Sequence, residues 1–168
     1  MRTRVTAMLC FIGLALAACG GGDGQAADPL AASLVDSYDC GYGFYLGTAD
    51  QSAGLFLVFT DFETALAGGT PETSALPHED WVAEVQMGSH LFTSWCDDTT
   101  PDPGQEPVVA ETWPVISGTI TVLAQPVPGV CGEARARLEA LTAQKPDGTT
   151  IVLGDFEISN RAFGCVSG

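Results

Sequence analysis

Apolar and polar side chains alternate along much of residues 38–168, in short runs separated by clusters of Gly, Pro and Asp. The runs 40–46, 81–87 and 116–123 place apolar side chains at every second position, and the run 55–59 is apolar on both faces. A period of two is typical of strands that bury one face, and a wholly apolar run suits a central strand. The residues expected to face the core are Tyr42, Phe44, Leu46, Trp81, Ala83, Val85, Met87, Ile116, Ile120 and Val122.

A hairpin is expected near the C-terminus. The sequence Lys-Pro-Asp-Gly-Thr at 145–149 is typical of a turn, because Pro fixes φ and Gly accepts a positive φ. Folding the chain about this turn sets Leu138 opposite Phe156 on one face. It sets Arg137 opposite Glu157 on the other face, where opposite charges stabilise a strand pair.

The segment 133–143 is where a helix competes with a strand, because its Ala, Leu, Glu and Arg residues have high helix propensity. The charge match across the hairpin favours the strand. Strands at this spacing without intervening helices predict an all-β domain, an antiparallel β-sandwich that ends in a C-terminal β-hairpin. The length of 38–168 fits one compact core.

The first eighteen residues differ in character from the rest. Arg2 and Arg4 precede an apolar run at 5–17. A run of about thirteen residues has the length of the apolar region of a signal peptide and is too short for a transmembrane helix. We therefore expect residues 1–18 to be a signal peptide that is cleaved.

The signal ends in Leu16, Ala17, Ala18 and Cys19, which together resemble the lipobox of prokaryotic lipoproteins. In that family a dedicated peptidase cuts before the Cys, the thiol carries diacylglycerol, and the new amine is often acylated as well. The resemblance covers this N-terminal segment alone. It implies that Cys19 anchors the protein through lipid to the extracytoplasmic face of a membrane. The alternative is an ordinary secretory signal that is cut after Ala17 or Ala18.

Residues 19–37 are expected to form a flexible tether, because the stretch that follows Cys19 is rich in Gly and Ala. The residue directly after Cys19 is Gly20. An Asp at this position would resemble the inner-membrane retention signal of some Gram-negative bacteria. Both the cell membrane and the outer membrane therefore remain open as the anchoring site.

Cysteine usage also indicates an exported protein. Beyond the signal and the lipobox, the chain has four cysteines, and an even count in an exported chain predicts two disulfides. The hairpin register brings Cys131 and Cys165 to one face, one diagonal step apart. With a small bulge or slip of the strands we expect Cys131–Cys165 and, by elimination, Cys40–Cys96.

The charge is strongly negative. Removing residues 1–18 takes Arg2 and Arg4 from the six basic side chains and leaves all 21 acidic ones, so the net charge falls from −15 to −17. Such a charge repels phosphate, which argues against nucleic acid as a partner. It suits a basic partner, a bound cation or solubility alone.

The densest acidic cluster suggests a calcium site. Asp97, Asp98 and Asp102, followed by Glu106, could supply oxygen ligands to Ca²⁺, although their spacing is not that of an EF-hand loop. A solvated acidic loop is the simpler interpretation. No other cofactor is expected.

His78 and His90 are the candidates for zinc or acid–base chemistry, but they flank an expected strand and lie in no metalloprotease motif. Surface positions for both are therefore expected. The chain also lacks the Gly-x-Ser-x-Gly nucleophile elbow of many hydrolases.

The aromatic side chains allow a further interpretation, a sugar-stacking platform on a sheet face. Burial in the core is the alternative, especially for the tryptophan beside Cys96. The residues concerned are Tyr42, Tyr45, Trp81, Trp95 and Trp113.

Together these patterns predict a membrane-anchored extracytoplasmic lipoprotein that acts as a binding or structural module of the cell envelope. Its partner is a protein or a glycan that the sequence does not identify. The balance of features favours a non-enzymatic role. The alternative is an envelope hydrolase that uses carboxylate or histidine chemistry.

Overall fold

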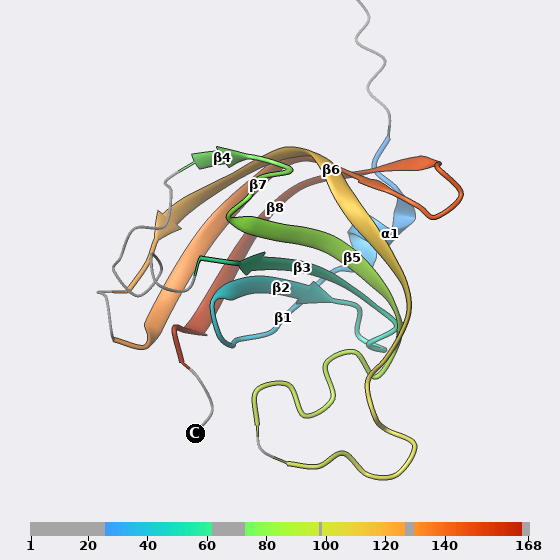
Figure 1. Ribbon diagram of the computed structural model, residues 1–168, viewed down its shortest axis with the longest axis vertical. Helices are drawn as coiled ribbons and strands as arrows, with labels where there is room; N and C mark the ends of the chain where they lie inside the picture. The colour runs from blue at the N-terminus through green and yellow to red at the C-terminus, as the bar shows by residue number, and fades with distance from the viewer. Residues whose placement is uncertain (1–25, 62–72, 98, 127–129, 166–168) are drawn as a thin grey trace, which may run out of the picture.

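The computed structural model describes residues 26–61, 73–97, 99–126 and 130–165, and within them the fold is almost entirely antiparallel β (Figure 1). The elements in chain order are α1 (Pro29–Ser33), β1 (Asp36–Ser37), β2 (Gly43–Gly47), β3 (Ala53–Phe59), β4 (Thr73–Ala75), β5 (Trp81–Ser89), β6 (Val108–Ala124), β7 (Gly132–Gln144) and β8 (Thr150–Phe163). The predicted all-β class is confirmed.

The strands form one strongly curved sheet in the order β1-β2-β3-β5-β6-β7-β8, with β4 paired to β6. Figure 1 shows β2, β3 and β5 in front of β7 and β8, so the two ends of the sheet curve towards each other. Backbone bonds join these ends where Gly41 N donates to Cys165 O (3.2 Å) and Gly164 N donates to Gly41 O (2.9 Å). The result is a nearly closed, barrel-like sheet whose opposite walls face each other across the core, as the layers of a sandwich would.

The core fills the inside of this sheet. Phe44 and Leu46 of β2 point inward with Trp81 and Val85 of β5, as the alternation predicts. The prediction is wrong for Ile116, which is 38% exposed. Register shifts in β6 between Val115 and Thr119 change which side chains face the core, so Val115 takes the inward position instead.

The C-terminal hairpin has the predicted register. Leu138 lies opposite Phe156 and Arg137 opposite Glu157, so 133–143 is a strand and not a helix. In the turn, Lys145 N donates to Thr149 O (2.8 Å).

Both predicted disulfides are present. Cys40–Cys96 ties the chain before β2 to the loop after β5, and its Cα atoms are 5.8 Å apart. Cys131–Cys165 ties the start of β7 to the end of β8, with a Cα separation of 4.9 Å. Each bond therefore joins segments that the sheet already brings together.

The folded body begins earlier than the sequence predicts. Asp28 caps α1 by accepting a hydrogen bond from Leu30 N, and Asp28 N donates to Val152 O of β8 (2.7 Å). Leu34 is buried in the core. Residues 28–37, expected in the tether, thus pack on the sheet because they supply an apolar side chain and paired backbone groups. Among the described residues, no helix is long and apolar enough to cross a membrane.

Candidate functional site

A second apolar cluster lies on the outer face of β2 and β3, opposite the main core. Tyr45 and Phe56 are paired across these strands, and the loop after β5 lays Leu91 and Phe92 over them. Phe56 stacks on Phe92 with ring centroids 5.1 Å apart, and Trp95 meets Tyr45 edge-on at 4.9 Å. This outer aromatic cluster (Tyr45, Phe56, Leu91, Phe92 and Trp95) binds the loop to the sheet.

Two glycines make room for the loop. Gly47 and Gly54 are opposite each other in β2 and β3, and a Cβ on either would lie 2.6–2.7 Å from the Phe92 ring. Tyr38 stacks on the ring of Phe92, with centroids 3.7 Å apart. Phe92 therefore has a fitted position, and the Cys40–Cys96 bond holds the loop there.

The outer aromatic cluster has no group poised for proton transfer at neutral pH. Burial raises the pKa of Tyr45 to about 12, so its hydroxyl stays neutral. The Nε1 atom of Trp95 is buried and has no hydrogen-bond partner within the described residues. The cluster is thus suited to packing.

The aromatic residues suggested as a sugar platform are not brought together on one face. Tyr45 and Trp95 are in contact on the outer face, but Trp81 and Trp113 are buried in the main core, against which Tyr42 also packs. The interpretation of Trp95 as a plug beside a disulfide fits its position in the outer cluster.

An exposed apolar strip lies next to the outer aromatic cluster and was not foreseen. Val58 of β3 is paired with Val82 of β5, whereas Ile116 of β6 lies beyond Pro114, the last residue of β6 with a described pairing to β5. Val82 is 45% exposed and Ile116 is 38% exposed. Val82 shares its face with Glu84 and Gln86, so its apolar character was a signal available in the sequence. We call the paired residues Val58 and Val82 the outer strip.

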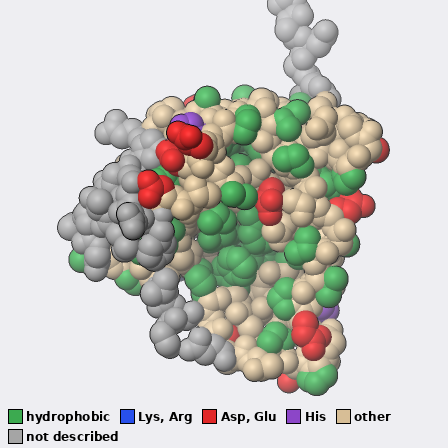
Figure 2. Space-filling view, in the orientation of Figure 1, with side chains coloured by type: hydrophobic (Ala, Val, Ile, Leu, Met, Phe, Trp, Pro, Cys, Tyr) green, Lys and Arg blue, Asp and Glu red, His purple; other side chains and the backbone are tan. Residues whose placement is uncertain are grey.

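The charges around the outer strip have one sign. Figure 2 shows hydrophobic side chains gathered over β2, β3 and β5 between acidic ones, with no Lys or Arg among the described residues of this face. The reason is in the sequence, because residues 20–130 contain no Lys or Arg. The basic side chains that follow are Arg135, Arg137, Lys145 and Arg161, all in or next to β7 and β8.

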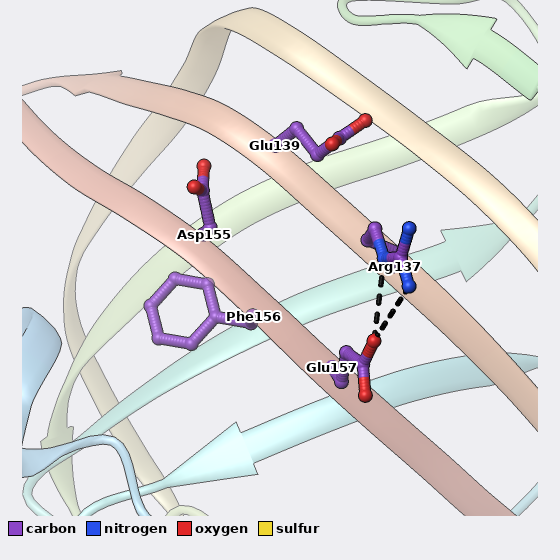
Figure 3. A pocket seen from close by; sticks show the side chains of 5 residues that line it. All are labelled: Arg137, Glu139, Asp155, Phe156 and Glu157. Atoms are coloured by element: carbon purple, nitrogen blue, oxygen red, sulfur yellow. Dashed lines mark hydrogen bonds and ion pairs between the residues drawn. The ribbon is translucent and has the colours of Figure 1, made fainter.

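The outer face of the β7–β8 hairpin carries an open hollow of about 350 Å³ (Figure 3). Arg137 lies over Glu157, and its Nε and Nη2 donate to Glu157 Oε1 at 3.2 and 2.9 Å, which raises the pKa of Arg137. Asp155 accepts a hydrogen bond from Ala140 N (2.7 Å). Glu139 and Phe156 complete the lining. The guanidinium of Arg137 and the carboxylate of Asp155 are therefore engaged in holding the hairpin together.

The turn between β2 and β3 contains a compact polar network. Asp50 Oδ1 accepts hydrogen bonds from the hydroxyls of Thr48 and Ser52, each at 2.7 Å. These bonds, that of Thr48 first, lower the pKa of Asp50 to about 2. The network closes the turn.

The two histidines lie apart. They flank opposite ends of β5, and nine residues of strand extend over roughly 27 Å. His78 Nδ1 accepts a hydrogen bond from Asp80 N (3.2 Å), and His90 lies in a turn at φ 55°. Between described residues, neither histidine is hydrogen-bonded to a hydroxyl or thiol. The expectation of surface positions fits this geometry.

The acidic loop is described except at Asp98. Asp97 accepts hydrogen bonds from the backbone and hydroxyl of Thr99, and the backbone O of Asp102 accepts from Gln105 N (2.9 Å). Within the described residues, no group of three or more potential ligands is placed to hold a metal. Asp98 falls outside those residues, so the calcium site stays a prediction. Cys19 also lies outside them.

Comparison of the chain with protein-family models, with curated proteins and with solved structures finds no match.

Proposed function

We propose that this chain is a lipid-anchored extracytoplasmic protein whose folded body acts as a binding or structural module of the cell envelope. The observation that carries the proposal is which cysteines form disulfides and which one does not. The chain has six cysteines, and the two disulfides use Cys40, Cys96, Cys131 and Cys165. Cys19, in the lipobox-like segment, is not among them.

The disulfides support the proposed extracytoplasmic location. Such bonds persist outside the reducing cytosol, in the periplasm or at the cell surface. The start of the folded body at Asp28 leaves only a short Gly-rich segment after Cys19. The body would therefore be held close to the membrane surface.

The surface of the body supports binding in preference to catalysis. The outer strip is apolar and its Val82 is exposed, as side chains of protein interaction sites commonly are. The polar groups of the β7–β8 face and of the β2–β3 turn are engaged in holding strands and turns.

The anchoring is tested by expressing the full chain in a bacterial host fed with labelled palmitate. We expect label in the wild-type protein, partition into detergent, and an intact mass that starts at Cys19 plus lipid. Cys19→Ser is the matched variant, and it should lose all three properties. Equal behaviour of the two proteins would overturn the proposal.

A further inference from the structure

We propose that the Cys40–Cys96 disulfide is a redox-sensitive switch, and that its reduction by a dithiol releases the loop segment 90–97 from the outer face of β2 and β3. This inference goes beyond the proposed role in the cell envelope and does not depend on it. The juxtaposition that carries it is a strained loop segment, tied down by one disulfide, over aromatic side chains that it buries.

The segment 90–97 covers an aromatic pair on the outside of the sheet. Tyr45 of β2 and Phe56 of β3 are each only 5% exposed. Phe92 stacks on Phe56, and Trp95 meets both Tyr45 and Phe56 edge-on, with ring centroids 4.9 and 5.8 Å apart. Displacement of the segment therefore exposes aromatic side chains of both strands.

The backbone of this segment is strained. Among the described residues, five residues other than Gly have a left-handed backbone, and three of them lie here: His90 (φ 55°), Ser94 (φ 55°) and Cys96 (φ 59°). In this conformation the Cβ atom crowds the following carbonyl oxygen, which is unfavourable for residues other than Gly. One of the three is a cysteine of the disulfide itself. The closed segment therefore has a conformational cost that an opened segment loses.

A buried polar group adds to this cost. Trp95 Nε1 is buried and has no hydrogen-bond partner within the described residues. An indole N–H in this situation has lost the hydrogen bond that water would give it, and opening of the segment restores that bond. Ring packing and the disulfide oppose these costs. Breaking the disulfide therefore shifts the balance towards the open segment.

Reduction of the disulfide is an exchange with the two thiols of the dithiol. Cys96 is exposed and Cys40 is half-buried, so a thiolate of the dithiol attacks Sγ of Cys96, and Cys40 leaves as a thiolate that takes up a proton. The second thiolate of the dithiol then attacks the reductant's own sulfur in the mixed disulfide and releases Cys96, which also takes up a proton. The dithiol supplies both electrons and ends as an intramolecular disulfide.

The Cys131–Cys165 disulfide lacks these features. Cys131 is also exposed, so access does not distinguish the two bonds. Neither of its cysteines has a left-handed backbone, and the left-handed neighbour is Gly164, which adopts φ 77° without strain. The pairing of β7 with β8 holds these strands together without the bond. A dithiol should therefore reduce Cys40–Cys96 first.

The order of reduction is measured on the full chain, purified oxidised in non-ionic detergent. Free thiols are blocked with one alkylating reagent, and the protein is equilibrated with rising ratios of reduced to oxidised dithiothreitol. Thiols released are labelled with a second reagent and located by mass spectrometry. We expect label on Cys40 and Cys96 at an about tenfold lower ratio than on Cys131 and Cys165. Equal reduction of the two bonds, or the reverse order, would overturn the proposal.

Release of the segment is measured by tryptophan fluorescence of the singly reduced protein. We expect a red shift and stronger quenching by acrylamide, because Trp95 becomes accessible while Trp81 and Trp113 stay buried. The matched variant Trp95→Phe should show no change on reduction. An unchanged wild-type signal would contradict the proposal, because the bond would then break without release. An equal change in Trp95→Phe would contradict it too, because the main core would then have opened.

Two glycine variants test the cause. Ser94→Gly relieves strain in the closed segment, so reduction of Cys40–Cys96 should need an about threefold higher ratio of reduced to oxidised dithiothreitol. Ala140→Gly gives the same relief at φ 54° on β7 and should leave that ratio unchanged. Equal ratios for the two variants would reject the proposal, because strain in the segment would then have no influence on the bond.

Discussion

At the scale of single residues, Asn160 is the polar side chain that joins the two ends of the sheet. It is fully buried on β8, and its Nδ2 donates to Cys40 O and Gly43 O, both at 2.8 Å. Its Oδ1 accepts from Ala162 N at 2.9 Å. All hydrogen-bonding directions of the amide except one lone pair are therefore used, which offsets the cost of burying it.

Replacement of Asn160 by Ala should lower the free energy of unfolding by roughly 2–4 kcal/mol, because it removes the donor to the buried Gly43 carbonyl and the part-buried Cys40 carbonyl and opens a cavity. Urea denaturation followed by circular dichroism measures the change. Ser159→Ala, on the neighbouring half-buried position, should cost less than about 0.5 kcal/mol. A loss below about 1 kcal/mol for Asn160→Ala would show that the bonds to β2 contribute little.

Asp50 should make stability depend on acid pH. Hydrogen bonds from Thr48 and Ser52 lower its pKa from the ordinary value of 3.8 to about 2 in the folded protein. A lowered folded pKa contributes stability that is present above pH 3.8 and is lost as pH falls towards 2. Thermal midpoints measured from pH 6 to pH 2 should fall more steeply in the wild type than in Asp50→Asn. Parallel curves would exclude this contribution.

At the scale of elements, the loop after β5 is attached to the sheet by both the outer aromatic cluster and the Cys40–Cys96 bond. Replacing both cysteines with Ala should cost about 4 kcal/mol in the chain-entropy model, and it should loosen the contact of Trp95 with Tyr45. Near-ultraviolet circular dichroism of the folded variant should show a reduced aromatic signal.

The second disulfide provides the matched control. Cys131→Ala with Cys165→Ala should destabilise the protein by a similar amount of about 4 kcal/mol. Its folded state should keep more of the aromatic signal, because this bond joins β7 to β8 and does not attach the loop after β5. A loss of signal in both double variants would mean that the loop depends on global stability alone.

Local patterns in the sequence were sufficient to predict some elements of the fold and not others. The hairpin register and Cys131–Cys165 follow from the turn at 145–149 and the match of Arg137 with Glu157, all of which are close in sequence. The outer aromatic cluster was not predicted. The run 55–59 indicated a strand apolar on both faces, but nothing local shows that Phe92, far along the chain, covers the second face.

At the scale of the whole molecule, closure of the sheet also escaped prediction. The antiparallel all-β class follows from alternation, which is a property of each strand. Whether the strands form separate layers or one curved sheet depends on contacts between β2 and β8, more than a hundred residues apart. The outer strip depends on similar pairing between strands, because β3 places Val58 beside Val82 of β5.

Calcium binding would change the thermal stability of the whole protein. If Asp97, Asp98 and Asp102 hold Ca²⁺, millimolar Ca²⁺ should raise the thermal midpoint by several degrees, because a ligand of the native state stabilises it. Magnesium at equal ionic strength is the control for screening of the net negative charge. The same shift with both ions would reject the calcium site.

The order of the disulfides along the chain has a consequence for biogenesis. The bonded cysteines Cys40 and Cys96 both precede Cys131 and Cys165 in the sequence. The chain loops closed by the two disulfides therefore follow one another and do not interlace. In a chain exported N-terminus first, with Cys10 in the cleaved signal and lipid on Cys19 as proposed, Cys40 and Cys96 are the first pair of free thiols to reach the oxidising compartment. Bonding of cysteines in their order of emergence then yields the native connectivity, so maturation should need an oxidant but no disulfide isomerase.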